Sequence, residues 1–392
     1  MKIYYKNWRL FLIFLFLFLS IAAIVSRMVY VQVEQGNFLL QKGNNQNTSE
    51  RVIKFKRGSI YDKNGIPLAI SITGFDLFAL SGLSEDDFLK IKNTLKLNDL
   101  EYKSFNKKSL IKNSLSFEEM RKVRSLRIDR LELEKTYKRH YPLGEQVAPL
   151  VGFSGRDGYG LEGLEKSYNS ILTGKPLKER VLRDGARSTI QRLEVLEFGE
   201  NSKDIYLTID SNIQYIAYKY LVEAIKNNDG TGGTVIILDN SAKEVLALAS
   251  YPSYNPNNPM RSIKKNRAFL ESYEPGSIVK PLALAGAIEK NLIDIDTELE
   301  LPIKIEVDGN IINDRKKYGQ LKAYEIIKES SQVGATQISF LLGAERLIDN
   351  YKKFGFSKPV NINFPSTSFG EINSRDEISD IEIATLGYGY GL

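Results

Sequence analysis

The sequence predicts an α+β protein of more than one domain, attached to a membrane by an N-terminal helix. Its 392 residues exceed the usual size of one domain. Residues 10–26 carry no charge and are mostly Leu, Phe and Ile, a length just sufficient to span a bilayer. Further along the chain, alternating apolar and polar segments joined by turns occur beside segments with helical periodicity.

The apolar segment also predicts an orientation. Lys2, Lys6 and Arg9 precede it, so the positive-inside rule places a tail at residues 1–9 in the cytoplasm and the bulk of the chain outside. The transmembrane helix and its extension are expected at residues 10–33. A cleaved signal peptide is the alternative, because a short apolar stretch after basic residues also describes one. We favour the anchor, because the Leu- and Phe-rich stretch is long for the core of a signal peptide.

The part after the anchor is expected to begin with a hairpin and a polar helical region. Residues 51–73 alternate apolar and polar side chains and break at Asn64-Gly65, which is a turn signal. Within residues 82–135, Ser84 and Ser116 are each followed by acids, as at a helix N-terminus. This region is predicted to be a solvated support without chemistry.

The second half of the chain predicts another hairpin. A strand at residues 204–210 and a helix at residues 212–226 should precede hairpin strands at residues 234–239 and 244–250. Two strands alone make a poor core, and the rest of the chain offers helices but few convincing strands. The glycines of residues 152–163 lack the fixed spacing of a phosphate-binding loop, which stays a weak alternative there.

Composition excludes several kinds of function. The net charge of +6 arises from basic residues interleaved with 48 acids, so we predict no nucleic-acid partner. The absence of cysteine excludes disulfides and thiolate chemistry.

His140 is the only histidine and is interpreted as part of an exposed basic run, residues 138–142, before a turn. No metal site or cofactor is expected. Because a Ser-His-Asp triad would depend on that one imidazole, a serine enzyme would do better with a lysine base.

One pattern carries candidate chemistry. Ser-x-x-Lys places a hydroxyl and an amine on one helix face, and it occurs at Ser104, Ser109, Ser262 and Ser277. Only Ser277 follows a turn and precedes an apolar helical run, which begins after Lys280. Ser277 is thus predicted at a helix N-terminus, where the dipole and free N–H groups favour developing negative charge. A partly desolvated Lys280 could activate it. An ordinary helix cap beside a surface lysine is the alternative.

Several segments of the chain resemble one protein family. The run EPGSIVKP at residues 274–281 resembles the active-site motif of class B penicillin-binding proteins. RGSIYDKNGIPLA at residues 57–69 resembles the signature of that family's N-terminal pedestal domain, as do YPLG at 141–144 and GYGLEGLE at 158–165. SDIEIATLGYGYGL at residues 379–392 is similar to the region after the second motif in the cell-division members, the FtsI type. The segments follow the family's order.

The resemblance implies an elongated α+β pedestal, or dimerisation-type, domain at residues 36–200 and a transpeptidase domain of β-lactamase-like fold at residues 201–392. It implies a peptidoglycan D,D-transpeptidase that cross-links stem peptides through a serine acyl-enzyme during septal wall synthesis. Lys280 would deprotonate Ser277, and Ser330 would relay a proton to the leaving group. The implied ligands are stem peptides and β-lactams. The implied partners are septal division proteins, including a glycan polymerase, at the inner membrane, with the bulk of the chain periplasmic.

The sequence departs from the family pattern in two places. The second motif, Ser-x-Asn, matches residues 330–332, where Gln332 replaces the asparagine. Glutamine keeps the amide that would contact substrate and Lys280, but its extra methylene shifts that amide. A plain helix N-cap is the alternative for this segment. The third motif, Lys-Thr-Gly or Lys-Ser-Gly, occurs nowhere in the 392 residues. The transpeptidase domain is therefore expected to be incomplete at its C-terminus, as a fragment of a longer protein or as a decayed product.

Two further hypotheses stay open. In the first, the chain is a non-catalytic, truncated division scaffold that keeps its membrane and partner contacts. In the second, it is a β-lactam sensor or a carboxypeptidase on the same fold. The pedestal match at residues 57–69 argues against the second.

Overall fold

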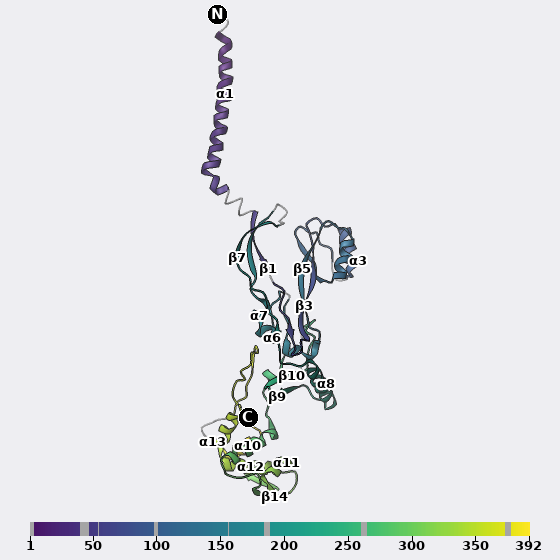
Figure 1. Ribbon diagram of the computed structural model, residues 1–392, viewed down its shortest axis with the longest axis vertical. Coiled ribbons are helices and arrows are strands. Elements are labelled where there is room, and N and C mark those ends of the chain that lie inside the picture. Colours follow the sequence, from purple (N-terminus) through teal and green to yellow (C-terminus); the bar gives the residue numbers. More distant parts are fainter. Residues whose placement is uncertain are drawn as a thin grey trace. The chain divides into compact units, whose positions relative to one another are not determined.

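The structure is a computed structural model (Figure 1). It divides into two compact units, Met1–Gly58 with Ser170–Asp204, and Ser59–Asn169 with Ile205–Leu392. The residues that the structure describes are 4–39, 47–53, 55–97, 101–155, 157–183, 189–259, 265–372 and 378–392.

The N-terminal helix α1 (Tyr4–Val29) is apolar around its circumference. Every side chain from Leu10 to Leu19 is at least 40% exposed, and a helix that is hydrophobic on all sides requires an apolar environment. A π-helix, η1 (Tyr30–Glu34), continues it. The segment Trp8–Glu34, 27 residues long, is long and apolar enough to cross a membrane. The predicted apolar helix is confirmed.

The first unit also contains a three-stranded antiparallel sheet in the order β1-β6-β7. Its strands are β1 (Thr48–Ile53), β6 (Leu177–Arg183) and β7 (Thr189–Glu197). Opposite charges face each other across the strands, as in the Lys178–Glu197 pair at 2.7 Å. The start of the hairpin predicted at residues 51–73 thus pairs with β6, which is distant in the sequence, instead of pairing locally.

The second unit begins with a five-stranded sheet, in which β4-β3-β2-β8 lie in order and β5 pairs with β3. The strands are β2 (Ile60–Tyr61), β3 (Pro67–Ala79), β4 (Ser109–Leu115), β5 (Leu131–His140) and β8 (Ile205–Tyr206). The predicted turn is confirmed between β2 and β3, where Gly65 has a φ of 81°. The Asp62 carboxylate accepts hydrogen bonds from the backbone N–H groups of Asn64 and Ile66 in this turn.

Two helices cover part of this sheet. They are α3 (Glu85–Leu95) and α4 (Phe117–Ser125), and the predicted caps are confirmed. Ser84 Oγ accepts from Asp87 N at 3.2 Å, and Ser116 forms a capping box with Glu119. The apolar faces of both helices are buried against β3 and β4 in one core.

The interpretation of residues 138–142 as an exposed basic segment is wrong. Arg139 and His140 end strand β5, and the Arg139 side chain is only 6% exposed. Its Nε donates to the buried Glu165 carboxylate at 2.7 Å, and a second guanidinium nitrogen donates to Ser71 Oγ at 3.1 Å. The glycine-rich segment leads into α6 (Gly163–Ser167), which supplies Glu165. A buried arginine needs such a partner, and the sequence does not reveal one that lies 26 residues away.

A buried tyrosine joins this region to the chain that follows the second hairpin. Tyr141 is 2% exposed, and its hydroxyl accepts a hydrogen bond from Ser154 N at 2.8 Å. The carboxamide of Asn257 forms hydrogen bonds with both the backbone N–H and the backbone carbonyl of Tyr141. Its Oδ1 accepts from Tyr141 N at 2.9 Å, and its Nδ2 donates to Tyr141 O at 3.0 Å. One side chain therefore does here what a paired strand would do.

The second hairpin and its helix are confirmed. Helix α8 (Ser211–Asn227) starts at the N-cap Asp210 and packs on the hairpin formed by β9 (Gly233–Asp239) and β10 (Glu244–Tyr251) (Figure 1). Their shared core contains Ala217, Leu221 and Ala247. On the other face Ile236 and Leu238 are about half exposed. In the described residues, β9 and β10 pair only with each other.

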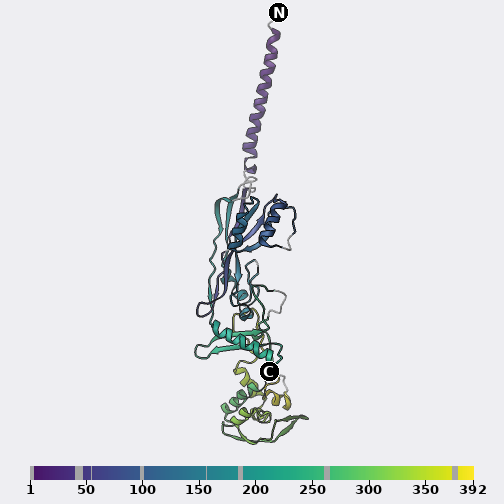
Figure 2. The same ribbon diagram turned by 90° about the vertical axis from the view of Figure 1, so that its right-hand side faces the viewer.

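The remainder of the second unit is a cluster of helices with two small sheets (Figure 2). The helices are α9 (Arg267–Leu270), α10 (Lys280–Glu289), α11 (Ala323–Glu329), α12 (Gln332–Leu342), α13 (Ala344–Lys353) and α14 (Asp380–Leu386). The strands are β11 (Glu298–Leu301), β12 (Lys304–Val307), β13 (Asn310–Asn313) and β14 (Gly319–Lys322), with β11 paired to β14 and β12 to β13.

The expectation of few further strands is therefore wrong for residues 298–322. Each strand has four residues, which is too short for period-2 alternation to be visible in the sequence. Apolar side chains from these strands and from α10, α12 and α13 share one core, which includes Ala283, Ile338 and Tyr351. This core fixes the helices that carry the candidate site.

Candidate active site

Ser277 lies on a short turn of 3-10 helix, η3 (Gly276–Val279), that leads directly into α10. Val279, Ala283 and Ala287 are buried at helical spacing and fix this helix in the core. Ser277 and its neighbour Ile278 remain exposed. The prediction of Ser277 at a helix N-terminus is confirmed.

Lys280, the first residue of α10, is only 2% exposed. Its Nζ donates to the Ser330 carbonyl oxygen at 2.6 Å and to Ser330 Oγ at 3.1 Å. Burial lowers the pKa of Lys280 to about 8, and the charge of Arg315 also lowers it, while the charge of Asp314 opposes the shift. At this pKa, roughly a tenth of the amine is neutral at pH 7. The alternative of a surface lysine is excluded by this burial.

Ser330 ends α11 with a left-handed backbone, φ 55° and ψ 39°. This conformation turns the chain sharply, so that α12 begins two residues later. Ser331 is the N-cap of α12, and its Oγ accepts from Gly334 N at 2.8 Å. Ser330 itself is exposed, and it faces Lys280 with both its carbonyl and its hydroxyl. The N-cap interpretation is correct for Ser331, and Ser330 is left to contact the lysine.

A buried carboxylate, missed at the sequence level, holds this turn in place. Asp314 is 6% exposed. It accepts from Ser331 Oγ at 2.6 Å, from Gln332 N at 2.6 Å and from Val333 N at 3.3 Å. A carboxylate at the start of a helix is stabilised by the free N–H groups and by the dipole. In sequence Asp314 is one of 48 acids, and no motif distinguishes it.

Gln332 occupies the first position of α12 and is exposed. Its backbone N–H binds Asp314 and its carbonyl accepts from Thr336. Among the hydrogen bonds of the described residues, none joins the Gln332 carboxamide to Lys280, whose Nζ is bonded to Ser330. None joins Ser277 Oγ to Lys280 either. The structure thus brings Lys280 and Ser330 into contact, with Ser277 one helical turn before the lysine and Gln332 two residues after the serine.

The segment after α14 lies against the Ser277 turn. Gly276 N donates to Gly389 O at 3.0 Å. A Cβ on Gly389 would lie 2.0 Å from the Gly276 oxygen, and a Cβ on Gly387 would lie 1.8 Å from Ser339 Oγ. Only glycine allows these approaches. Tyr351 holds the end of α14 through a 2.8 Å hydrogen bond from its hydroxyl to Leu386 O.

The three other Ser-x-x-Lys sequences lack this environment or cannot be compared with it. Ser104 lies outside helices and strands, and Ser109 begins strand β4. Ser262 lies outside the described residues. Ser277 is therefore the one of the three described serines that precedes a helix with its lysine buried.

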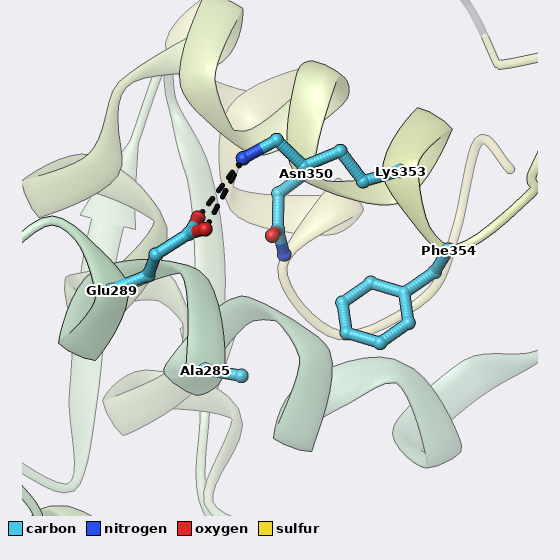
Figure 3. Close-up of a pocket in the computed structure, with 5 residues that line it drawn as sticks. All are labelled: Ala285, Glu289, Asn350, Lys353 and Phe354. Carbon is cyan, nitrogen blue, oxygen red and sulfur yellow. Dashed lines mark hydrogen bonds and ion pairs between the residues drawn. The ribbon is translucent and has the colours of Figure 1, made fainter.

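A surface depression of about 300 Å³ lies at the other end of α10, between α10 and α13 (Figure 3). It is lined by Ala285, Glu289, Asn350, Lys353 and Phe354. Glu289 and Lys353 form an ion pair at 3.0 Å across it, and Asn350 Nδ2 donates to Leu282 O at 2.7 Å. The Asn350 hydrogen bond joins α13 to α10, and the exposed ion pair adds little to it. None of the candidate site residues lines this depression.

Comparisons with known proteins identify the family. A model of the penicillin binding protein transpeptidase domain matches residues 233–392, and one of the penicillin-binding protein dimerisation domain matches residues 52–207. The chain is 33% identical, over 99% of its length and 69% of the relative's, to a probable peptidoglycan D,D-transpeptidase PenA of Neisseria gonorrhoeae. It is 29% identical to the peptidoglycan D,D-transpeptidase FtsI of Escherichia coli K12, over 98% of its length and 68% of the relative's.

Solved structures agree with these matches at the level of the fold. A complex between penicillin-binding protein PBP2 and MreC from Helicobacter pylori matches with a TM-score of 0.71 and 22% identity, over 88% of this chain and 73% of that one. Penicillin binding protein 2X from Streptococcus thermophilus matches with a TM-score of 0.68 and 22% identity, over 88% and 57%. The chain therefore belongs to the class B penicillin-binding proteins, with a dimerisation domain and a transpeptidase domain.

Proposed function

We propose that this chain forms a serine acyl-enzyme in the cross-linking of peptidoglycan, with Ser277 as nucleophile and Lys280 as its base. The supporting observation is that Lys280 is buried and that the pKa of its amine is lowered to about 8. Lys280 is also the first residue of a helix, one turn after an exposed serine. A lysine in this state can accept a proton near neutral pH, whereas an exposed lysine cannot do so efficiently.

The reaction proposed for this site has two stages. Neutral Lys280 takes the proton of Ser277 Oγ, which bonds to the carbonyl carbon of the penultimate D-alanine of a stem peptide. The peptide C–N bond breaks, and terminal D-alanine leaves with a proton that Lys280 returns through the Ser330 hydroxyl. An amine of a neighbouring stem then forms a C–N bond with the ester carbonyl carbon, the ester C–O bond breaks, and Lys280 passes the proton of the amine to Ser277 Oγ. The contact of Lys280 with Ser330 Oγ at 3.1 Å supports this proton path.

Covalent labelling by penicillin tests the proposal. A β-lactam should acylate Ser277, because its strained amide carbonyl takes the place of the stem peptide, and ring opening retains the whole molecule. Intact mass spectrometry should show one added penicillin on the wild-type chain. The Ser277→Ala variant should show none, while its thermal unfolding midpoint stays close to that of the wild type. An equal adduct on Ser277→Ala, or none on a folded wild type, would contradict the assignment.

The rate of this acylation should rise with pH. Burial lowers the pKa of Lys280 to about 8, and the neutral form acts as the base. About a tenth of the amine is neutral at pH 7 and about nine tenths at pH 9, so we expect the acylation rate to increase roughly tenfold between them and then level off. Stopped-flow measurements with a fluorescent penicillin at constant ionic strength check this. A rate independent of pH over this interval would remove Lys280 from the role of base.

The cellular setting is proposed from family membership and the charge pattern. The bulk of the chain would lie on the periplasmic side of the inner membrane, because Lys2, Lys6 and Arg9 precede the apolar helix. Partners would be septal division proteins, including a glycan polymerase. The division into a pedestal at residues 36–200 and a transpeptidase domain at residues 201–392 stays part of this proposal.

One observation favours a non-catalytic scaffold as a second candidate. Gln332 stands where the family motif has asparagine, and its carboxamide makes no hydrogen bond to Lys280 among the described residues. A folded chain that is not acylated by penicillin, and that becomes acylated when Gln332 is replaced by Asn, would support a catalytic site lost at this position.

A further inference from the structure

Two residues that precede Ser277, Glu274 and Gly276, are joined to the segment after α14. Gly276 N donates to Gly389 O, and Gly391 N donates to the carboxylate Oε1 of Glu274, both at 3.0 Å. The partners step in opposite directions, since 276 meets 389 and 274 meets 391. One of the two acceptors is a backbone carbonyl, and the other is the Glu274 carboxylate.

The segment 387–391 that makes these contacts is itself fixed to the helices of the site. Residues 387–391 follow α14, whose last carbonyl accepts from Tyr351 on α13. Gly387 lies against α12, because a Cβ there would meet Ser339 Oγ and the Ala335 carbonyl oxygen. Helix α12 starts at Gln332, two residues after the serine that contacts Lys280. The two hydrogen bonds therefore link the Ser277 turn to the element that carries the other half of the site.

Glu274 has no competing ionic role in the described part of the chain. It is exposed, and no ion pair there includes it. Glu271, three residues earlier, is paired with Lys265 and Arg267. The Glu274 side chain is thus held by a backbone N–H, as a charge-assisted hydrogen bond.

We propose that Glu274 is a positioning residue, which fixes the direction of Ser277 by holding Gly391 and with it the 387–391 segment. The inference rests on the proposed function of Ser277. Glu274 would affect the rate through the position of the Ser277 hydroxyl, because a misplacement of a nucleophile by about 1 Å can slow a reaction roughly a hundredfold. Without the carboxylate, the Gly276–Gly389 hydrogen bond alone would join the turn to residues 387–391, and the turn could shift relative to that segment.

The test compares Glu274→Ala and Glu274→Gln with a matched control, Glu289→Ala, which removes an exposed glutamate at the far end of α10. Two quantities are measured for each: the acylation of Ser277 by a fluorescent penicillin, separated into the dissociation constant of the initial complex and the acylation rate constant, and the hydrogen exchange of residues 387–392. Thermal unfolding midpoints report the fold. Glu274→Gln keeps an oxygen that can accept from Gly391.

We expect Glu274→Ala to lower the acylation rate constant by about tenfold or more with little change in the dissociation constant. Exchange at Gly391 should accelerate, while the unfolding midpoint stays near that of the wild type. Glu274→Gln should recover most of the rate, and Glu289→Ala should behave as the wild type. Unchanged acylation and unchanged protection in Glu274→Ala would overturn the inference. So would equal slowing in Glu274→Ala and Glu274→Gln together with a lower unfolding midpoint.

Failure of the proposed function gives a different result. If the folded wild type forms no acyl-enzyme, the assignment of Ser277 fails, but exchange at Gly391 still reports on Glu274. Lost protection in Glu274→Ala alone would then support the link between the two segments, and equal protection in all variants would overturn it.

Discussion

Replacement of Lys280 by arginine or methionine is expected to abolish acylation by penicillin, with a loss of about 100- to 10,000-fold in rate. Arginine keeps the positive charge but cannot give up its proton, so it cannot serve as the base. Methionine keeps much of the buried volume and removes the amine. The measurement is the rate of labelling by a fluorescent penicillin, with circular dichroism to show that each variant is folded.

The control for this prediction lies at the C-terminal end of the same helix. Lys290 follows the last residue of α10 and is exposed, so the Lys290→Met variant should be acylated at the wild-type rate. An active Lys280→Arg variant would contradict the prediction directly, because it would show that a permanently protonated side chain suffices at this position.

Replacement of Asp314 should weaken both the fold and the site. In Asp314→Ala, the Ser331 hydroxyl and the N–H groups of Gln332 and Val333 lose their common acceptor. Because hydrogen bonds to a charged acceptor are the stronger kind, we expect a loss of about 3 kcal/mol in the free energy of unfolding. Urea denaturation followed by fluorescence measures it. Removal of a buried carboxylate that accepts from three donors leaves more unsatisfied polar groups than most single replacements do.

The Asp314→Asn variant separates charge from packing. The Asp314 charge raises the pKa of Lys280 against the larger effect of burial, so its removal should lower that pKa further. The pH at which acylation reaches half its maximum should then fall below that of the wild type. Asp296→Asn is the control, since Asp296 is exposed and paired with Lys322. An upward shift of the pH midpoint in Asp314→Asn, or no shift, would contradict this account.

The fold was predictable where its determinants are local. The turn at Asn64-Gly65, the caps at Ser84 and Ser116, and the hairpin of β9 and β10 each depend on residues within a few positions of one another. The pairing of β1 with β6 and the burial of Arg139 by Glu165 depend on partners that are distant in sequence. Periodicity carries no information about such partners.

The same division holds within the site. Ser277 and Lys280 could be placed from their own neighbourhood, because a turn, a hydroxyl and an apolar helix are adjacent there. Asp314 could not, since its donors lie 17 to 19 residues later, and nothing in a run of short strands marks one acid among many. The contact of Lys280 with Ser330 also spans 50 residues, and only the resemblance connected the two.

The two glycines of the chain's last segment constrain how this site can vary in evolution. Gly387 and Gly389 have no space for a side chain, because their neighbours are the Ser339 hydroxyl and the Gly276 backbone. Substitution beside the nucleophile is therefore open only at side chains that point outward, such as Ile278, 71% exposed, and Tyr390, 48% exposed. Natural variants that change ligand preference without losing the fold are expected to alter this outer rim, while the contacts beneath it stay constant.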